Sequence, residues 1–504
     1  MRKVAIVSLD STQIKLTLAS ILDTETFVEE EQISEGIKVA ADLCDDGLIK
    51  PSRISELMMI LKSFKALITA NEVTEIFAYA TNEFLEAKNQ KSFFEEIYSE
   101  TGFRFTILSK DEQMLNSYTA VINSLDVPKG LLVVIGGTKT QLLCYNRRNL
   151  LNQHTLDIGV CSLAEKYVKQ GVNPQDYCKQ MYDYVLKHLK SIDFIKDIEP
   201  EIQIVGIGDA FLSMGKLSRK LKRYAYDKEH NYVMNSASVS EVYDFIKTLD
   251  LDKTKKLKGI SADRADYLAS GFSIIKAIQD ATTLDNVVVS DCGLTEGVLF
   301  NKACPTTAEK PLSDILGYSL NAINSFYNTY SKNTPHVYEL ALILFKQLKV
   351  LHKLSRTYVR VLRIASTLHD CGKRISATNY TKNGYSIVLN SNIYGATHRE
   401  QVLAGFVVSC QYLENFSMTE WVKYKDLLLE EDLEAVRKLA VIVRLADSLD
   451  KFNRGLITDI NCDILGDSVI MKTVATSPAD LEIREGIKIE NDFIKAYKKH
   501  LELL

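Results

Sequence analysis

The first quarter of the chain repeats a simple pattern of apolar strands and amphipathic helices. Apolar and polar residues alternate over residues 1–36, which predicts a three-stranded meander that ends near Gly36. Apolar residues then recur at helical spacing over 53–72, and a short strand follows at 74–80. Helix, strand and helix continue to alternate to about Asn123. This alternation predicts a mixed α/β sheet covered by helices.

The stretch 131–142, LLVVIGGTKTQL, combines a buried strand, a turn with two glycines and a return strand. Because glycine lacks a Cβ, the backbone N–H groups of such a turn can close on an anion. A similar strand, turn and strand opens the chain at 4–16. The pair predicts two phosphate-binding turns, and a purely structural hairpin is the competing interpretation. The candidate phosphate-binding residues are Ser11, Thr12, Gly136, Gly137, Thr138, Lys139 and Thr140.

A second α/β unit begins with this glycine-containing hairpin. Its predicted elements are helices at 174–191, 208–220 and 263–282 and a strand at 286–290. A polar stretch with two prolines at 301–312 marks the boundary that ends the unit.

Beyond this boundary the chain is almost wholly helical in pattern. The predicted helices are 315–330, 337–354, 356–368, 398–413 and 433–450. Two alternating stretches, ITDINCDIL and SVIMKTVA, and a helix at 479–502 end the chain. We therefore expect four parts, at 1–125, 126–305, 306–455 and 456–504.

Length and composition are those of a globular protein with several domains. The chain has 504 residues, of which 46% are apolar and 25% charged, and this length exceeds what one hydrophobic core supports. With a net charge of −4, any anion site must be a local basic patch. No apolar run approaches the roughly 18 residues of a membrane span, and the N-terminus does not resemble a signal peptide. The nine cysteines are scattered without a CxxC pair, as in reducing compartments. We expect a cytoplasmic protein with no membrane partner.

Four separated motifs resemble the exopolyphosphatase and guanosine pentaphosphate phosphohydrolase family, in the family order. They are ATNEFLEAKN (80–89), SKDEQMLNSYTAVIN (109–123), SDCGLTEGVLF (290–300) and VRVLRIASTLHDCGKRI (359–375). The resemblance spans nearly the whole chain. It implies two domains of the actin, hexokinase and Hsp70-like (ribonuclease H-like) α/β fold around a cleft, then an all-helical HD-like domain and a small C-terminal α/β segment. It also implies a homodimer.

The chemistry that the resemblance implies is hydrolysis of a terminal phosphoanhydride. In such a site carboxylates bind Mg²⁺ and activate a water, glycine-rich turns bind the phosphate, and arginines neutralise its charge. Most of these groups are replaced at the matching positions of this chain. The acids fall on Ser8, Gln113, Val134 and Gln141, and two arginines fall on Leu85 and Thr295. Glutamine accepts no proton at neutral pH and valine binds no metal, so the resemblance predicts a degenerate active site.

Three acidic residues offer an alternative that keeps activity. Glu112 lies next to Gln113, Asp10 lies in the first turn, and Glu296 precedes Gly297. A local shift would bring these carboxylates to Mg²⁺ or Mn²⁺ in place of the lost ones. Glu296 and Arg264 are the best-retained charged positions of the match, and for both the choice is between a substrate contact and a structural salt bridge.

The helical part resembles an HD-type phosphohydrolase module. His369 and Asp370 form the His-Asp pair, Asp447 matches the later acid, and His336 lies one helical turn from the position of the first histidine. The resemblance implies a site for Mn²⁺, Fe²⁺ or Mg²⁺ at these residues. The competing interpretation is a vestigial module in which His369 and Asp370 form hydrogen bonds to helix ends.

Two classes of function follow from these observations. The first is a binding or regulatory protein whose degenerate site takes polyphosphate, a guanosine polyphosphate or a partner subunit, such as an intact paralogue. The basic segments 216–226 and 253–259 would guide such a polyanion, unless they are ordinary solvated surface. The second class is a working phosphatase that uses Mg²⁺ or Mn²⁺. No stacking pattern singles out nucleic acid, which we do not expect as a partner.

Overall fold

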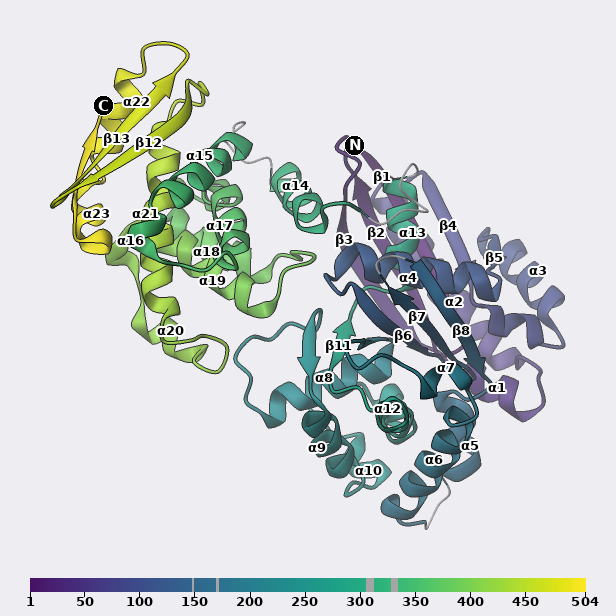
Figure 1. The fold of residues 1–504 in the computed structure, drawn as a ribbon. Helices are drawn as coiled ribbons and strands as arrows, with labels where there is room; N and C mark the ends of the chain where they lie inside the picture. The colour runs from purple at the N-terminus through teal and green to yellow at the C-terminus, as the bar shows by residue number, and fades with distance from the viewer. Residues whose placement is uncertain (147–148, 169–171, 305–311, 328–333) are drawn as a thin grey trace. The chain divides into compact units, whose positions relative to one another are not determined.

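The computed structural model describes residues 1–146, 149–168, 172–304, 312–327 and 334–504. These residues form two compact units, Met1–Ile315 (unit 1) and Leu316–Leu504 (unit 2). Figure 1 colours unit 1 from purple to teal and unit 2 from green to yellow. None of the described helices combines the length and the apolar character that crossing a membrane requires.

A five-stranded sheet opens unit 1, with the strand order β3-β2-β1-β4-β5. The predicted meander is confirmed, because β2 pairs antiparallel with both β1 and β3, while β4 and β5 continue the sheet in parallel. Alternate residues of β1, namely Ala5, Val7 and Leu9, enter the core that the helices cover. The elements are β1 (Arg2–Leu9), β2 (Gln13–Ile21), β3 (Phe27–Gly36), α1 (Val39–Asp45), α2 (Pro51–Ala70), β4 (Glu75–Ala80), the 3₁₀ helix η1 (Asn82–Glu86), α3 (Gln90–Thr101) and β5 (Phe105–Ile107).

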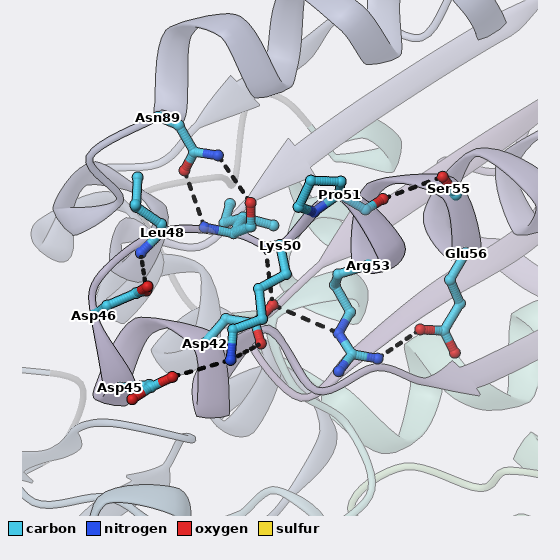
Figure 2. Close-up of polar contacts among 11 residues, drawn as sticks. Asp42, Asp45, Asp46, Leu48, Lys50, Pro51, Arg53, Ser55, Glu56 and Asn89 are labelled. Carbon is cyan, nitrogen blue, oxygen red and sulfur yellow. Dashed lines mark hydrogen bonds and ion pairs between the residues drawn. The ribbon is translucent and has the colours of Figure 1, made fainter.

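A network around Asp42 fixes the connection from α1 to α2. Asp42 is 3% exposed, and its Oδ2 accepts the Lys50 backbone N–H at 3.2 Å and lies 3.7 Å from Arg53 Nε. Figure 2 shows Lys50 and Arg53 converging on Asp42, with Asn89 bound to the backbone of the same connection. This network holds α1, whose first turn contacts the first hairpin.

A six-stranded sheet forms the second half of unit 1, in the order β10-β11-β9-β6-β7-β8. Strands β6, β9 and β11 are parallel, so their carboxyl ends lie at one edge. Period-two alternation buries both faces, since Leu131 and Val133 enter one core and Leu132 enters another beneath α4. The strands are β6 (Lys129–Ile135), β7 (Thr140–Asn146), β8 (Asn149–Leu156), β9 (Gln203–Ile207), β10 (Tyr232–Met234) and β11 (Val287–Ser290).

The two faces of this sheet are covered by different helices. Met114, Tyr118 and Val121 of α4 pack on one face, and residues of α5, α6, α8, α9 and α12 pack on the other. α13 lies against α4 so closely that a Cβ at Gly297 would come 1.9 Å from the Asn116 carbonyl oxygen. The helices are α4 (Lys110–Ser124), α5 (Val160–Tyr167), α6 (Pro174–Leu189), α7 (Asp193–Lys196), α8 (Asp209–Leu221), α9 (Ser236–Ile246), α10 (Leu251–Thr254), α11 (Ala262–Ala265), α12 (Leu268–Thr282) and α13 (Leu294–Ala303).

Unit 2 is helical up to a small C-terminal sheet. Its first helix, α14, begins at Ile315, the last residue of unit 1. Its long helix α21 is buried over much of its length and contacts α15, α17, α19 and α22. The helices are α14 (Ile315–Tyr327), α15 (Thr334–Gln347), α16 (Lys349–His352), α17 (Tyr358–Thr367), η3 (Cys371–Arg374), α18 (Tyr380–Asn390), α19 (His398–Ser409), η4 (Leu413–Asn415), α20 (Met418–Lys423) and α21 (Asp432–Leu449). The end of the predicted helix 315–330 and the predicted boundary at 305/306 lie outside the described residues.

The C-terminal segment differs from the prediction of one helix over 479–502, which is wrong. The structure has α22 (Asp480–Ile487), α23 (Glu490–Tyr497) and then β14 (His500–Leu503). β14 pairs in parallel with β13 (Ser468–Ala475), which pairs antiparallel with β12 (Ile457–Leu465). The left-handed backbone at Lys498 ends α23 and turns the chain into the strand.

Candidate functional site

The glycine turn of the second hairpin holds a carboxylate from another part of the chain. Residues 136–139 connect β6 to β7, and the Gly136 N–H donates to the Lys139 carbonyl at 2.8 Å. Glu83 of η1 accepts, through Oε1, the Thr138 backbone N–H at 2.9 Å and the Thr138 hydroxyl at 2.7 Å. A Cβ at Gly136 would lie 3.3 Å from this oxygen, and Glu83 is only 5% exposed. A carboxylate oxygen therefore occupies the turn where the sequence predicts a phosphate oxygen.

The polar side chains beside this turn also have partners within the protein. The Lys139 ammonium pairs with the carboxylate of Glu86, which lies on the same 3₁₀ helix as Glu83. The Thr140 hydroxyl is buried and donates to the Ile158 carbonyl at 2.7 Å. These two predicted phosphate contacts are therefore engaged in internal pairs.

The carbonyl groups of the glycine turn satisfy the start of α5. Gly136 accepts from the Val160 N–H at 3.0 Å, and Gly137 accepts from the Cys161 N–H at 2.8 Å. The first N–H groups of a helix otherwise need a capping side chain, water or an anion. This helix N-terminus is therefore capped by the turn itself.

The structure brings the two predicted turns into direct contact. A Cβ at Gly137 would lie 2.5 Å from the Ser11 hydroxyl and 2.8 Å from the Ala40 Cβ. Ser11 is fully buried, and its carbonyl accepts the Ala40 N–H at 2.7 Å. The first and second hairpins thus meet at Ser11 and Gly137.

Asp10 organises the turn of the first hairpin. Its Oδ1 accepts the Thr12 N–H at 2.7 Å, the Thr12 hydroxyl at 2.6 Å and the Gln13 N–H at 2.8 Å. Burial raises the pKa of Asp10 to about 6, the hydrogen bonds from Thr12 oppose this rise, and the nearby charges of Glu83 and Asp209 add to it. Asp10 therefore lies near Glu83 and is bound within its own turn.

The positions that match family carboxylates do not form a cluster of oxygen ligands. Ser8, on β1, accepts a hydrogen bond at 3.5 Å from the hydroxyl of Thr295, the position that matches an arginine. Val134 pairs with Gln141 across β6 and β7 and packs on the core under α4. The Gln141 side chain is 5% exposed, and its Oε1 has no partner among the described residues.

The candidate base Glu112 lies at the N-terminus of α4. Its carboxylate accepts the Ser109 N–H and hydroxyl at 2.8 Å each, and the Glu112 N–H donates to Ser109 Oγ, which makes a capping box. Its side chain is exposed, and these hydrogen bonds lower the pKa of Glu112. Gln113 instead turns toward η1 and accepts the Asn82 N–H at 3.4 Å. Gln113, and not Glu112, thus contacts the 3₁₀ helix that carries Glu83.

Glu296 belongs to a separate buried charge cluster. Its two oxygens accept the Gly293 N–H at 2.6 Å and the Lys15 ammonium at 3.1 Å, and it is 3% exposed. Burial and the negative charge of Glu296 raise the pKa of Glu29 to about 8, although Lys15 opposes the rise. The ion pair joins β2 to α13. The contacts of Glu296 are thus those of a salt bridge within the fold.

Arg264 also forms an ion pair within unit 1. Its guanidinium lies 3.0 Å from Asp209 Oδ1, at the start of α8. Burial raises the pKa of Asp209, and the Arg264 charge opposes this rise. The pair leaves Arg264 partly exposed beside the carboxyl end of β9.

The candidate HD-like residues of unit 2 form ion pairs with one another and with lysines. His369 is fully buried, with Nδ1 2.7 Å from the Ser366 carbonyl and Nε2 3.1 Å from Asp447 Oδ1. Burial lowers the pKa of His369, but the hydrogen bond to Asp447 reverses this effect and the net shift is upward. The Lys373 ammonium lies 3.5 Å from the Asp370 carboxylate, and the Lys451 ammonium lies 3.1 Å from the Asp447 carboxylate.

His336 lies in a different pair. It contacts Asp450 at 3.1 Å and the Ile457 carbonyl at 2.8 Å. Among the described residues, the four candidates do not bring three donor atoms within 4.8 Å of one another. In the described structure Lys373 and Lys451 pair with two of these acids, while Asp370 Oδ1 is buried without a hydrogen-bond partner.

Sequence reasoning missed Glu83 and Glu86. Both lie in the motif ATNEFLEAKN, but at positions flanking the one that matches the family arginine. The signal available in the sequence was the appearance of two acids where a phosphate-binding turn would favour cations. Both acids lie more than fifty residues before the glycine turn in the sequence. Only the folded structure shows that they contact it.

Comparison with known proteins gives one consistent result. Residues 11–304 match the Ppx/GppA phosphatase family, and residues 318–480 match domain III of Ppx/GppA phosphatases. A guanosine-5'-triphosphate,3'-diphosphate pyrophosphatase of Pseudoalteromonas translucida is 22% identical over 386 residues, which are 73% of this chain and 72% of that protein.

Solved structures show the same fold for the N-terminal part. A Ppx/GppA family member from Aquifex aeolicus has a TM-score of 0.52 at 24% identity, and an exopolyphosphatase from Cytophaga hutchinsonii has 0.55 at 15%. Each covers 60% of this chain and 98% of its own. The two-sheet unit thus has the actin-like fold of these proteins, and a helical region follows it.

Proposed function

The chain belongs to the Ppx/GppA phosphatase family, and we propose that it is a member that binds polyphosphate or a guanosine polyphosphate without hydrolysing it. The class of ligand comes from relatives named as a guanosine-5'-triphosphate,3'-diphosphate pyrophosphatase and as exopolyphosphatases. The observation that carries the absence of hydrolysis is the Glu83 carboxylate held by the glycine turn, and we assign binding to the basic segments 216–226 and 253–259, outside that turn.

A phosphate in this turn would compete with Glu83 for the same donors. Glu83 Oε1 uses both the backbone N–H and the hydroxyl of Thr138. A phosphate oxygen bound to the same donors would lie next to the Glu83 carboxylate, and two negative charges in contact repel each other strongly where water is excluded. A phosphate would therefore enter only after the Glu83 side chain leaves, and its departure would break two hydrogen bonds to a charged group.

The residues at the family metal positions do not suit Mg²⁺. Magnesium prefers carboxylate oxygens, whereas Ser8, Gln113, Val134 and Gln141 offer a hydroxyl, two amides and an alkyl group. Ser8 is also hydrogen-bonded to Thr295. No group at these positions can accept a proton from water near neutral pH. These four residues therefore do not support a metal-dependent step.

Binding without turnover suits a regulatory role. A protein of this kind would hold or sense a phosphate polymer, or would act on an intact paralogue or a second copy of itself. The basic segments 216–226 and 253–259 supply a surface for the polymer, because the ammonium groups of Lys216 and Lys220 both lie beside Gly259. Neither ammonium forms an ion pair within the part of the chain that the structure describes.

A working hydrolase with carboxylates at new positions is the second candidate. Burial raises the pKa of Asp10 to about 6, and the negative charge of nearby Glu83 adds to this rise. A raised pKa of this kind favours proton exchange near neutral pH. In this candidate Glu83 and Asp10, rather than Glu112, would serve the reaction.

Phosphate release distinguishes the two candidates. The purified chain is incubated with long-chain polyphosphate or guanosine pentaphosphate, with Mg²⁺ or Mn²⁺ present, and free phosphate is measured. The proposal expects no release above that of a sample without protein. Release that disappears in Glu83→Gln would overturn it in favour of the hydrolase.

Binding of inorganic phosphate tests the blocked turn itself. Glu83→Gln keeps an oxygen that can accept from Thr138 but removes the negative charge, so phosphate affinity should rise at least about tenfold. Glu112→Gln, an exposed residue at a helix cap, is the matched control and should change nothing. Equal phosphate affinity in wild type and Glu83→Gln would show that Glu83 does not block an anion site.

A further inference from the structure

Three side chains with different metal-ligating atoms meet at the carboxyl end of β11. The donor atoms of His230, Asp291 and Cys292 all lie within 4.8 Å of one another, and no other group of three among the described residues does so. His230 Nδ1 is 2.7 Å from Asp291 Oδ1, and Cys292 Sγ is 3.5 Å from the same oxygen. These residues take no part in the candidate phosphate site.

Strand pairing fixes the backbone on both sides of this group. Asp291 and Cys292 directly follow β11, and His230 lies two residues before β10, which pairs with β11. The Asn231 N–H donates to the Val289 carbonyl at 2.8 Å, and the Ser290 hydroxyl donates to the Cys292 carbonyl at 2.7 Å. The three ligands therefore project from rigid backbone, as a preorganised site requires.

A backbone carbonyl selects the tautomer of His230. Its Nε2 lies 3.2 Å from the carbonyl oxygen of Ser124, at the C-terminal end of α4. A carbonyl only accepts, so Nε2 carries a hydrogen. The 2.7 Å contact with the Asp291 carboxylate also requires a hydrogen on Nδ1, and a metal ion that displaces it leaves the neutral ring with its hydrogen on Nε2. Metal-ligating histidines commonly have their other ring N–H fixed in this way.

We propose that His230 Nδ1, the Asp291 carboxylate and the Cys292 thiolate bind one Zn²⁺ ion. Nitrogen, oxygen and sulfur ligands together suit Zn²⁺, and three protein ligands leave a fourth tetrahedral position open. His230 and Cys292 are 6% and 3% exposed, whereas the Asp291 side chain is 39% exposed and gives the ion access from solvent. On binding, the Cys292 thiol proton and the His230 Nδ1 proton pass to solvent as the thiolate and the Nδ1 lone pair bond to zinc, and no redox step is involved.

The competing occupant of the site is a proton. A proton on His230 Nδ1 would give an imidazolium that pairs with Asp291, and Lys228 lies near enough to interact with Asp291. Glu29 also interacts electrostatically with Asp291, and Lys15 partly balances the negative charge of Glu29 and Glu296. Whether metal or proton occupies Nδ1 is decided by direct metal binding.

Cobalt binding to the full chain reads out the thiolate ligand. Apo protein prepared with a chelator is titrated with Co²⁺, and one equivalent should produce a thiolate-to-cobalt charge-transfer band and the visible bands of tetrahedral Co²⁺. Adding Zn²⁺ should remove both sets of bands. Cys292→Ser should lose the charge-transfer band, while the buried control Cys144→Ser should keep it.

Isosteric variants guard against loss of folding. Asp291→Asn and His230→Gln should each weaken Zn²⁺ affinity at least about tenfold with unchanged circular dichroism. Zinc should raise the melting temperature of the wild type and not that of Cys292→Ser. The proposal is overturned if the wild type binds no Co²⁺ and no Zn²⁺ at micromolar concentration, or if Cys292→Ser keeps the charge-transfer band.

Discussion

At the scale of single residues, the glycine turn shows how one side chain changes what a motif can bind. Gly136 and Gly137 form the tight turn between β6 and β7 that the sequence predicts, and the Gly136 N–H donates to the Lys139 carbonyl at 2.8 Å. Glu83 supplies a negative charge to this turn from within the chain. The motif is therefore retained while its donors are used within the chain.

Gly137 is required by packing between the two hairpins. A methyl group there would lie 2.5 Å from Ser11 Oγ and 2.8 Å from Ala40 Cβ, and both neighbours are buried. Gly137→Ala should lower the free energy of unfolding by about 1–3 kcal/mol, as overpacking does elsewhere. Urea denaturation measures the loss. Ser11→Ala removes the nearest atom and should restore part of the stability in the double variant, so equal losses with and without it would contradict this contact.

Asp10 should make stability depend on pH. Its folded pKa of about 6 lies above the ordinary value of 3.8, so the unfolded chain loses this proton first as pH rises. The contribution of Asp10 is absent below pH 3.8 and becomes a full penalty above about pH 6. Asp10→Asn keeps the Oδ1 acceptor and removes the charge. It should be more stable than wild type by about 3 kcal/mol at neutral pH, because each pKa unit of the rise corresponds to about 1.4 kcal/mol, and the difference should vanish near pH 3.

Urea denaturation at several pH values checks this prediction. Asp467→Asn is the matched control, because the side chain of Asp467 is 97% exposed in a hairpin turn. A stability difference between wild type and Asp10→Asn that is the same at acid and neutral pH would show that burial does not control the Asp10 proton.

At the scale of elements, local pattern predicted most strands and helices, and pairing partners explain the exceptions. The meander over 1–36 and helix 174–191 follow from period-two and helical spacing, and both are confirmed within a few residues. The helix predicted over 479–502 is wrong because its last residues form β14, whose partner β13 lies about thirty residues earlier. The candidate site shows the same limit. The glycines of the turn could be recognised in the sequence, but the contact with Glu83 could not, because Glu83 lies on η1, far away in sequence.

The last strand should carry stability that a continuous helix would not need. Leu501 and Leu503 are buried while His500 and Glu502 are exposed, an alternation that belongs to β14 and not to a helix. Leu501→Ala and Leu503→Ala should each cost about 2–5 kcal/mol of unfolding free energy, measured by urea denaturation. Glu502→Ala is the control and should stay within about 0.5 kcal/mol of wild type. Similar losses for all three variants would contradict the strand.

At the scale of the whole molecule, charge is unevenly distributed over a mildly acidic chain. The net charge is −4, yet the two basic segments meet where the Lys220 ammonium donates to the Lys258 carbonyl. Some lysines of this surface are balanced, since Lys253 pairs with Asp250 and Lys255 pairs with Asp266. Lys222 donates to the Ser238 hydroxyl. The other four, Lys216, Lys220, Lys256 and Lys258, form no ion pair in the residues that the structure places. These four form the basic surface considered next.

This basic surface should bind polyphosphate in a strongly salt-dependent way. Exposed charges are screened within about 10 Å at 0.1 M salt and about 3 Å at 1 M, so affinity for a labelled polyphosphate should fall steeply between these conditions. Replacing all four lysines with glutamine should weaken binding at low salt at least about tenfold, because each removes an attraction to a multiply charged chain. In the matched control, glutamine replaces four other exposed lysines, Lys91, Lys179, Lys382 and Lys425. Both variants therefore lower the net charge by the same amount. Equal loss of affinity in both variants would mean that polyphosphate responds to total charge and not to this surface.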